Sequence, residues 1–469
     1  MSLDGESEKI NFEASLLATP DMFENLCKLP LPGDVFSQAL HPTEPLLTVG
    51  LYNGRIQSFR LPASVSAADS SSDELADAET SILSDGKGTI AEIWGTRRHK
   101  KSCRSLAYTP DGAAMFSAGA DGIVKHFSSA TGRVVSKTLM PEFGGHPDTP
   151  SIVHAIDPQH LLLACDSGAL HIFDVRDGLP AKPARTSFPH SDYISSIVPL
   201  PPTNPGGAAS FPKQWVSTGG QTLAVTDLRS GTLVQSDDQE DDLLCATYVP
   251  GIGPKKVANK GSVAVGGSTG VLTLWDRGSW DDQQERIIVD SGRGGGESID
   301  SVALMPDDLG YGKKAVTGLG DGRIRMVDLV TREVDATFTL RHDEIEAVLA
   351  IDFDCYNRMI SAGGRVIQIW EDLTELQGGD SDSGDGEDDD EDGEDDENDS
   401  DNGGGCAIDR PKGGQKRARD DDSDSDGSDD SADERAKRTE AKDKKRKAAL
   451  AAKLGPMGAH GVLKFDGLE

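Results

Sequence analysis

The chain has 469 residues and is strongly acidic, with 80 Asp and Glu against 47 Lys and Arg and a formal net charge of −33 at pH 7. This charge argues against holding nucleic acid through the overall field and favours basic protein partners. No apolar run approaches the roughly 18 residues of a membrane span, and the polar start MSLDGESEKI does not match a secretory signal. We therefore expect a soluble intracellular protein with no membrane partner.

The cysteines occur singly, without a Cys-x-x-Cys pair, and this spacing argues against a zinc site and against a disulfide scaffold. It suits a reducing compartment. The six are Cys27, Cys103, Cys165, Cys245, Cys355 and Cys406. We expect no metal site, no cofactor and no small-molecule substrate.

One pattern occurs seven times between Leu46 and Trp370. In each copy an apolar run ends in small residues, a Gly-containing pair predicts a tight turn, and an alternating apolar run follows. The copies read LLTVGLYNGRIQSF, MFSAGADGIVKHF, LLLACDSGALHIF, WVSTGGQTLAVTD, VAVGGSTGVLTLW, AVTGLGDGRIRMV and MISAGGRVIQIW. Self-similarity at a period of about 40–50 residues is typical of a propeller or a solenoid. The sequence therefore predicts an all-β fold, a seven-bladed β-propeller.

The alternation in the second half of each copy predicts a strand with one apolar, buried face. Two copies carry the turn glycine one position early, at Gly220 and Gly364. Upstream segments 105–108 and 351–353 predict inner strands beside the central channel. Because a propeller ring is often closed by a strand from the other end of the chain, residues 23–38 are the candidate closing strand.

Composition divides the chain into three parts. We expect a disordered N-terminal extension over 1–21, the propeller over 22–372, and a disordered charged tail over 373–469. Within the propeller, residues 64–88 are rich in Ser, Asp, Ala and Glu and predict a disordered acidic insertion. Residues 371–469 hold 32 acidic and 15 basic side chains with almost no aromatics, so they cannot bury enough apolar surface to offset the entropy of ordering.

The tail also contains short basic clusters set among acidic residues, a composition typical of nuclear localisation signals. They predict a nuclear and nucleolar protein. The residues are Lys416, Arg417, Arg419, Lys437, Arg438, Lys444, Lys445, Arg446 and Lys447.

Catalytic motifs are weak. The run 266–270 (GGSTG) matches the nucleophile-elbow pattern, which requires a strand-to-helix turn. Here the run joins two predicted strands, so we interpret Ser268 as a hairpin residue. The histidines near blade starts predict structural hydrogen bonds and no catalytic set; they are His41, His99, His190 and His342. We predict no enzyme.

The segment 96–104 (TRRHKKSCR) gathers basic residues on an acidic domain. One interpretation is a solvated turn that leads into the second blade; the other is a contact with RNA phosphate or a partner, where Lys and Arg release counterions. The candidates are Arg97, Arg98, Lys100, Lys101 and Arg104.

Two consecutive copies end in Asp-x-Arg, at Asp174 with Arg176 and at Asp227 with Arg229. Such paired motifs resemble the boxes by which some WD-repeat proteins dock on a cullin–RING ligase adaptor. The alternative is a salt bridge at each blade corner. Neither copy has the Trp that usually precedes the Asp.

Several segments together resemble the nucleolar WD-repeat proteins of fungal Jip type, which have animal and plant counterparts. The segments are 22–51, 96–112, 213–231 and 266–287. The resemblance covers about residues 22–370, and the tail by composition. It implies ribosome biogenesis, with effects on pre-ribosomal RNA processing and large-subunit assembly, and supplies no catalytic residue. Residues 1–21 depart from the family pattern as either an extra arm or a mistaken start codon.

The sequence therefore predicts a non-enzymatic scaffold that binds pre-ribosomal proteins or assembly factors, with a direct pre-rRNA contact as a further expectation. The alternative is a substrate receptor of a nuclear cullin–RING ubiquitin ligase, with the ligase adaptor as its partner.

Overall fold

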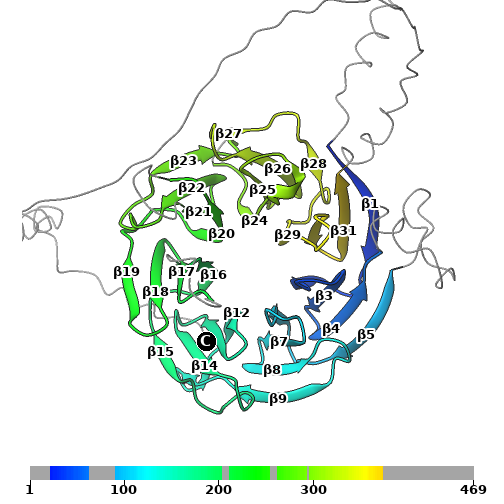
Figure 1. Ribbon diagram of the computed structural model, residues 1–469, viewed down its shortest axis with the longest axis vertical. Coiled ribbons are helices and arrows are strands. Elements are labelled where there is room, and N and C mark those ends of the chain that lie inside the picture. The colour runs from blue at the N-terminus through cyan, green and yellow to red at the C-terminus, as the bar shows by residue number, and fades with distance from the viewer. Residues whose placement is uncertain (1–21, 63–89, 203–210, 254–260, 293–294, 373–469) are drawn as a thin grey trace, which may run out of the picture. The chain divides into compact units, whose positions relative to one another are not determined.

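The computed structural model describes residues 22–62, 90–202, 211–253, 261–292 and 295–372. In these ranges seven antiparallel sheets surround a central axis as the blades of a propeller (Figure 1). Their regular structure is strands, apart from the single-turn 3-10 helix η1 (Asp307–Leu309). The prediction of an all-β, seven-bladed propeller is confirmed.

Blades 1 to 4 follow chain order, each with its first strand innermost. Blade 1 contains β2 (Val35–Leu40), β3 (Leu46–Leu51), β4 (Arg55–Arg60) and β5 (Ala91–Arg97). Blade 2 contains β6 (Cys103–Tyr108), β7 (Ala114–Gly119), β8 (Ile123–Ser128) and β9 (Val134–Leu139). Blade 3 contains β12 (Pro150–Asp157), β13 (His160–Cys165), β14 (Leu170–Asp174) and β15 (Arg185–Ser187). Blade 4 contains β16 (Ile194–Leu200), β17 (Gln214–Gly219), β18 (Thr222–Asp227) and β19 (Gly231–Gln235).

Blades 5 to 7 complete the ring. Blade 5 contains β20 (Leu243–Pro250), β21 (Gly261–Gly267), β22 (Val271–Asp276) and β23 (Glu285–Ile288). Blade 6 contains β24 (Ile299–Leu304), β25 (Lys314–Leu319), β26 (Arg323–Asp328), β27 (Glu333–Val334) and β28 (Leu340–Arg341). Blade 7 contains β29 (Ala350–Phe353), β30 (Met359–Gly363), β31 (Val366–Asp372) and β1 (Phe23–Pro30). A short hairpin, β10 (Glu142–Phe143) with β11 (His146–Pro147), lies between blades 2 and 3.

The middle strands are buried on both faces. All seven residues of β21 are buried, as are all six of β3. The third strands, for which one buried face was expected, are buried on both faces in β4 and β22 as well, because each blade is packed between two neighbours. Among the described residues, seven buried apolar clusters fill the spaces between adjacent blades, one at each boundary. The outer strands alternate instead; in β9 exposed and more buried residues succeed one another.

The closing strand comes from the N-terminal end. β1 pairs antiparallel with β31, with Phe23 opposite Asp372 and Pro30 opposite Val366. The candidate 23–38 is confirmed for Phe23–Pro30, whereas its last residues belong to β2, the innermost strand of blade 1. The blade 7 sheet therefore joins residues more than 300 positions apart.

The turn glycines adopt the left-handed backbone that their pairs predicted. Gly54 has φ of 78°, and a Cβ there would lie 2.2 Å from the carbonyl oxygen of His99. The two displaced glycines, Gly220 (φ 53°) and Gly364 (φ 51°), are left-handed as well. Both hairpin forms therefore depend on glycine for the same reason, because a side chain is disfavoured at positive φ.

Three predicted segments lie outside the described residues: the extension 1–21, the insertion 64–88 and the tail 373–469 with its basic clusters. Within the described ranges no helix has the length and apolar character that spanning a membrane requires.

Candidate functional site

The propeller has two faces with different loops. In each blade the innermost strand begins at one face of the propeller and ends at the opposite face. The face where it begins therefore carries two kinds of loop: the hairpins between second and third strands and the connections from one blade to the next. We call it the hairpin face; it includes Asn53, Asp121 and Ser268. The opposite face carries the turns after each third strand, at Asp174 and Asp227, and we call it the corner face. The basic segment 96–104 and the Asp-x-Arg motifs thus lie on opposite faces.

The basic segment connects β5 to β6 on the hairpin face, and its side chains fall into two groups. Arg97, Lys100 and Lys101 are exposed. Lys100 donates its backbone N–H to Asp121 Oδ2 at 2.9 Å, which orders the connection and leaves the ammonium group outside. These three side chains are therefore accessible from the solvent on the hairpin face.

The other two basic residues are engaged within the propeller. The Arg98 guanidinium lies 5.9 Å from the ring centre of Trp94 and 5.4 Å from that of Phe127, and burial lowers its pKa. Arg104 forms an ion pair with Asp166 at 2.6 Å. The five-residue candidate surface is therefore reduced to three exposed cations, because aromatic rings and Asp166 hold Arg98 and Arg104 in place.

Histidines hold the connections between blades, as predicted for three of the four. His99 lies 2.9 Å from Ser117 Oγ and 3.0 Å from Asp121 Oδ1. His190 and His342 make comparable bonds to serines of the second strands. His41 also makes a structural hydrogen bond, with a ring nitrogen 3.2 Å from the carbonyl oxygen of Gly112. It differs from the other three in its place, because it follows β2 on the corner face and does not lie in a connection between blades.

Burial sets the charge state of these rings. It lowers the pKa of His99 despite the nearby Asp121, and it lowers the pKa of His190 to about 4. His99 and His190 are therefore neutral at physiological pH and act as hydrogen-bonding links.

Ser268 is a hairpin residue, as predicted. It lies in the turn between β21 and β22, and its hydroxyl donates to Asp241 Oδ1 at 2.6 Å, while Thr269 donates to Asp241 Oδ2 at 2.6 Å. The turn joins two strands, so the strand-to-helix geometry of a nucleophile elbow is missing at this serine.

The two Asp-x-Arg corners lie on neighbouring blades but differ in their contacts. Asp174 accepts from Arg176 Nε at 2.9 Å, and this pairing lowers the pKa of Asp174 to about 2. Asp227 accepts backbone N–H groups from Arg229 and Ser230, both at 2.9 Å. The salt-bridge interpretation thus fits the first corner. At the second, the carboxylate caps a turn and Arg229 is exposed.

Sequence reasoning missed an arc of exposed carboxylates on the hairpin face of blades 4 to 7, which we call the acidic arc. None of its members forms an ion pair with a described residue. The members are Asp192, Asp237, Asp238, Glu240, Asp242, Glu297, Glu344 and Glu346. Between the last two lies Ile345, which is 81% exposed. The net charge indicated an acidic protein, but only the closed ring brings these connections together on the hairpin face.

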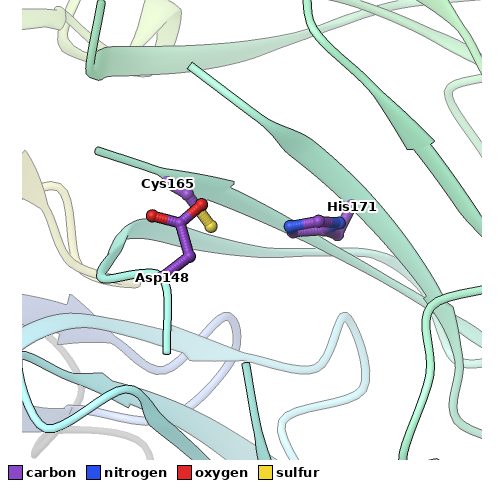
Figure 2. Close-up of side chains that lie close together, drawn as sticks. All are labelled: Asp148, Cys165 and His171. Atoms are coloured by element: carbon purple, nitrogen blue, oxygen red, sulfur yellow. The ribbon is translucent and has the colours of Figure 1, made fainter. Parts of the chain in front are cut away.

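Blade 3 carries a second feature that the sequence did not indicate. Asp148, Cys165 and His171 are buried together, with their ligand-type atoms all within 4.8 Å of one another (Figure 2). Burial and the neighbouring Asp148 raise the pKa of the Cys165 thiol. Asp148 and His171 also line a cavity of about 680 Å³ between blades 2 and 3. The spacing of the cysteines could not reveal this group, because only one cysteine takes part.

Comparison with known proteins supports this architecture. The family model described as WD domain, G-beta repeat matches residues 92–128, which span the outer strand of blade 1 and the first three strands of blade 2. One sequence repeat is thus offset from one blade, consistent with β1 completing the last blade. WD40 propellers are generally non-enzymatic platforms for protein interaction.

Three curated fungal proteins align along most of the chain, each named WD repeat-containing protein JIP5. The protein of Botryotinia fuckeliana is 50% identical over 362 residues, covering 76% of this chain and 83% of the relative. That of Phaeosphaeria nodorum is 50% identical over 361 residues (75% and 83%), and that of Aspergillus niger 48% over 357 (75% and 82%). Given this identity and coverage, the chain belongs to the fungal JIP5 family of WD repeat-containing proteins.

Proposed function

We propose that this propeller is a non-enzymatic scaffold in ribosome biogenesis that uses the acidic arc to bind basic segments of pre-ribosomal proteins or assembly factors. The nucleolar role comes from the family resemblance, and the acidic arc is the observation that supports a basic partner. Pre-rRNA processing and large-subunit assembly are the steps it would serve, and the basic clusters of the tail would direct the chain to the nucleus and nucleolus.

The electrostatics of the arc support this proposal. Carboxylates without ion-pair partners keep their charge available, and a row of like charges along one rim raises the local concentration of a cationic segment and its association rate. Ile345, between Glu344 and Glu346, offers an apolar contact at the same place. Because exposed charges are screened by salt, with a Debye length of about 8 Å at physiological ionic strength, binding should weaken steeply as salt rises.

Affinity purification of the tagged full-length chain, read by mass spectrometry and RNA sequencing, tests the proposal. We expect Glu344→Lys with Glu346→Lys to reduce recovery of ribosomal proteins and pre-rRNA. A matched double change on the corner face, Asp177→Lys with Asp308→Lys, alters the net charge equally and should leave recovery unchanged. Equal recovery with both doubles, or a wild-type chain that recovers no pre-ribosomal material, would contradict the proposal.

A direct pre-rRNA contact is assigned in this proposal to the exposed cations Arg97, Lys100 and Lys101. Reversing these three to Glu should lower RNA crosslinking while the protein partners remain. Arg98 and Arg104 are left unchanged, because their contacts stabilise the fold. Unaltered crosslinking of the folded triple variant would remove RNA from the partners proposed for this surface.

The second candidate, a substrate receptor of a nuclear cullin–RING ligase, is favoured by one observation: both Asp-x-Arg corners face the same side on adjacent blades. Arg176 is held by Asp174, so Arg229 is the residue more available to an adaptor. Loss of the adaptor from pull-downs of the Arg176→Ala, Arg229→Ala double variant, with normal ribosomal profiles, would favour this candidate over the scaffold.

A further inference from the structure

Blade 3 departs from the other blades at two equivalent positions beside the hairpin face. The last residue of the second strand is Cys165, where blades 2, 4, 5 and 7 have glycine and blades 1 and 6 have Leu51 and Leu319. The third-strand position opposite Leu163 holds His171. The corresponding residues of the other blades are Gln57, Lys125, Ala224, Thr273, Arg325 and Gln368. In blade 3 a thiol thus stands where the other blades have glycine or leucine, and an imidazole replaces a non-ligating side chain.

The connection from blade 2 brings a carboxylate to the same place. Asp148, Cys165 and His171 are 7%, 0% and 4% exposed. Asp148 accepts a hydrogen bond from Ser167 Oγ, but it forms no ion pair with any described residue. A buried carboxylate without a cationic partner is costly, and a bound cation would remove that cost.

His171 is oriented toward this carboxylate. Its Nδ1 lies 2.8 Å from Thr186 Oγ1, whereas its Nε2 is buried and has no hydrogen-bond partner among the described residues. Figure 2 shows the ring with one nitrogen directed toward Cys165 and Asp148. With Nδ1 donating to Thr186, the lone pair of Nε2 is available to a metal, the arrangement by which outer hydrogen bonds orient ligating histidines.

We propose that Asp148, Cys165 and His171 bind one Zn²⁺ ion, with a fourth coordination position that opens to the cavity between blades 2 and 3. A thiolate, an imidazole nitrogen and a carboxylate oxygen are the ligand types that zinc takes in proteins. The mutual separations of up to 4.8 Å are wider than a tetrahedral site needs, so binding would draw the three side chains inward.

The cavity supplies access and the remaining ligand. Asp148, His171 and Thr186 lie in its wall together with apolar residues that include Phe143 and Phe188. A water molecule there would complete the coordination, and the ion would join the connection before β12 to the second and third strands of blade 3 through one charged centre. This proposal does not depend on the scaffold function, since it concerns only these side chains.

Cobalt substitution tests the site directly, because a Co²⁺–thiolate bond gives a near-ultraviolet charge-transfer band that carboxylate ligation lacks. The full-length chain with Cys406→Ser, which removes the tail cysteine, is stripped with a chelator and titrated with Co²⁺ in excess Mg²⁺. The Mg²⁺ occupies the hard, all-oxygen sites of the acidic surface. We expect one Co²⁺ per chain with the thiolate band, and loss of the band when Zn²⁺ is added.

Three variants identify the ligands. Cys165→Ser should abolish the band. Thr186→Val removes the hydrogen bond that orients His171 and should weaken Zn²⁺ binding about 10–100-fold. His171→Gln removes a ligand and should weaken Zn²⁺ binding more than Thr186→Val does. Cys103→Ser is the matched control, a buried cysteine elsewhere that should leave binding intact. A band that is absent from the parent chain or survives Cys165→Ser would overturn the proposal. Unchanged Zn²⁺ affinity in the folded His171→Gln and Thr186→Val proteins would also overturn it. These two variants provide the test if Cys165→Ser does not fold.

Discussion

At the scale of single residues, the environment decides what an Asp–Arg pair does. Arg358 is 1% exposed, and its guanidinium donates to Asp354 Oδ2 at 2.9 and 2.6 Å and to the carbonyl oxygen of Pro62 at 2.9 Å. Arg176 pairs with Asp174 in a similar way but lies in solvent. The same two residue types thus form an interior link between blades 7 and 1 in one case and a surface contact in the other.

Replacing Arg358 by Ala should lower the free energy of unfolding by about 3–5 kcal/mol, because Asp354 would remain buried without its partner. Arg176→Ala should leave the melting temperature unchanged, since exposed pairs contribute little. Chemical denaturation of both variants checks the contrast. Equal losses would show that burial does not decide the contribution of these pairs.

The histidines between blades predict how stability depends on pH. The folded-state pKa of His190 is about 4, below the ordinary value of about 6.5 that applies in the unfolded chain. The unfolded chain therefore binds more protons between these values, so the stabilisation is fully present above pH 6.5 and is lost as pH falls toward 4. His99 and His342 shift in the same direction for the same reason, burial.

We expect urea unfolding midpoints to fall steadily from pH 7 to pH 4.5, with a shallower fall in His190→Gln. The single change should not remove the slope completely, because the other buried histidines still titrate in the unfolded chain. A His190→Gln protein with the slope of the wild type would show that this ring is not kept neutral by the fold.

At the scale of elements, β1 is the strand on which closure depends. Phe23 is 1% exposed and packs against the rings of Tyr311 and Phe338 in the cluster between blades 6 and 7. Without this strand β31 would be an uncovered sheet edge with a row of unpaired backbone groups. One short segment near the start of the chain thus protects the last blade.

Phe23→Ala should lower the free energy of unfolding by about 3–5 kcal/mol, the range for a buried aromatic residue in a packed core. Phe36→Ala serves as control, since Phe36 is 44% exposed at the start of β2 and should change stability far less. Denaturant titrations of both proteins compare them. Comparable losses would mean that the closing strand contributes through its backbone pairing and not through this side chain.

The elements themselves were largely predictable. Turn pairs such as Asp121-Gly122 and the inner strand at 105–108 follow from local dihedral preferences and alternation, so each was visible within about ten residues of sequence. The burial of the third strands could not be predicted in the same way. β4, for example, is buried on both faces, because the neighbouring blades cover it and these blades are formed by other parts of the chain. Positions such as His41 were also misplaced, since a histidine between two strands looks the same at either face.

At the scale of the whole molecule, ring closure sorts the charges. The basic segment 96–104 reads as one cluster, yet the packed ring directs Arg98 onto Trp94 and Phe127 and pairs Arg104 with Asp166 in another blade. Conversely, acidic residues that are spread from 192 to 346 in the sequence come together on the hairpin face as the acidic arc. Sequence proximity therefore overstated the basic surface and gave no indication of the acidic arc.

The amino-acid sequence by itself determined the number of blades and the hairpin turns, because these depend on backbone preferences and on a short-range apolar pattern. The tertiary structure alone decided which charged side chains remain exposed and which polar residues meet. Cys165 and His171 lie on paired strands of blade 3 and Asp148 lies in the connection before β12, and the three become neighbours only when the strands of this blade pair. The physical reason is that periodicity is local, whereas burial and charge pairing depend on every blade around the ring.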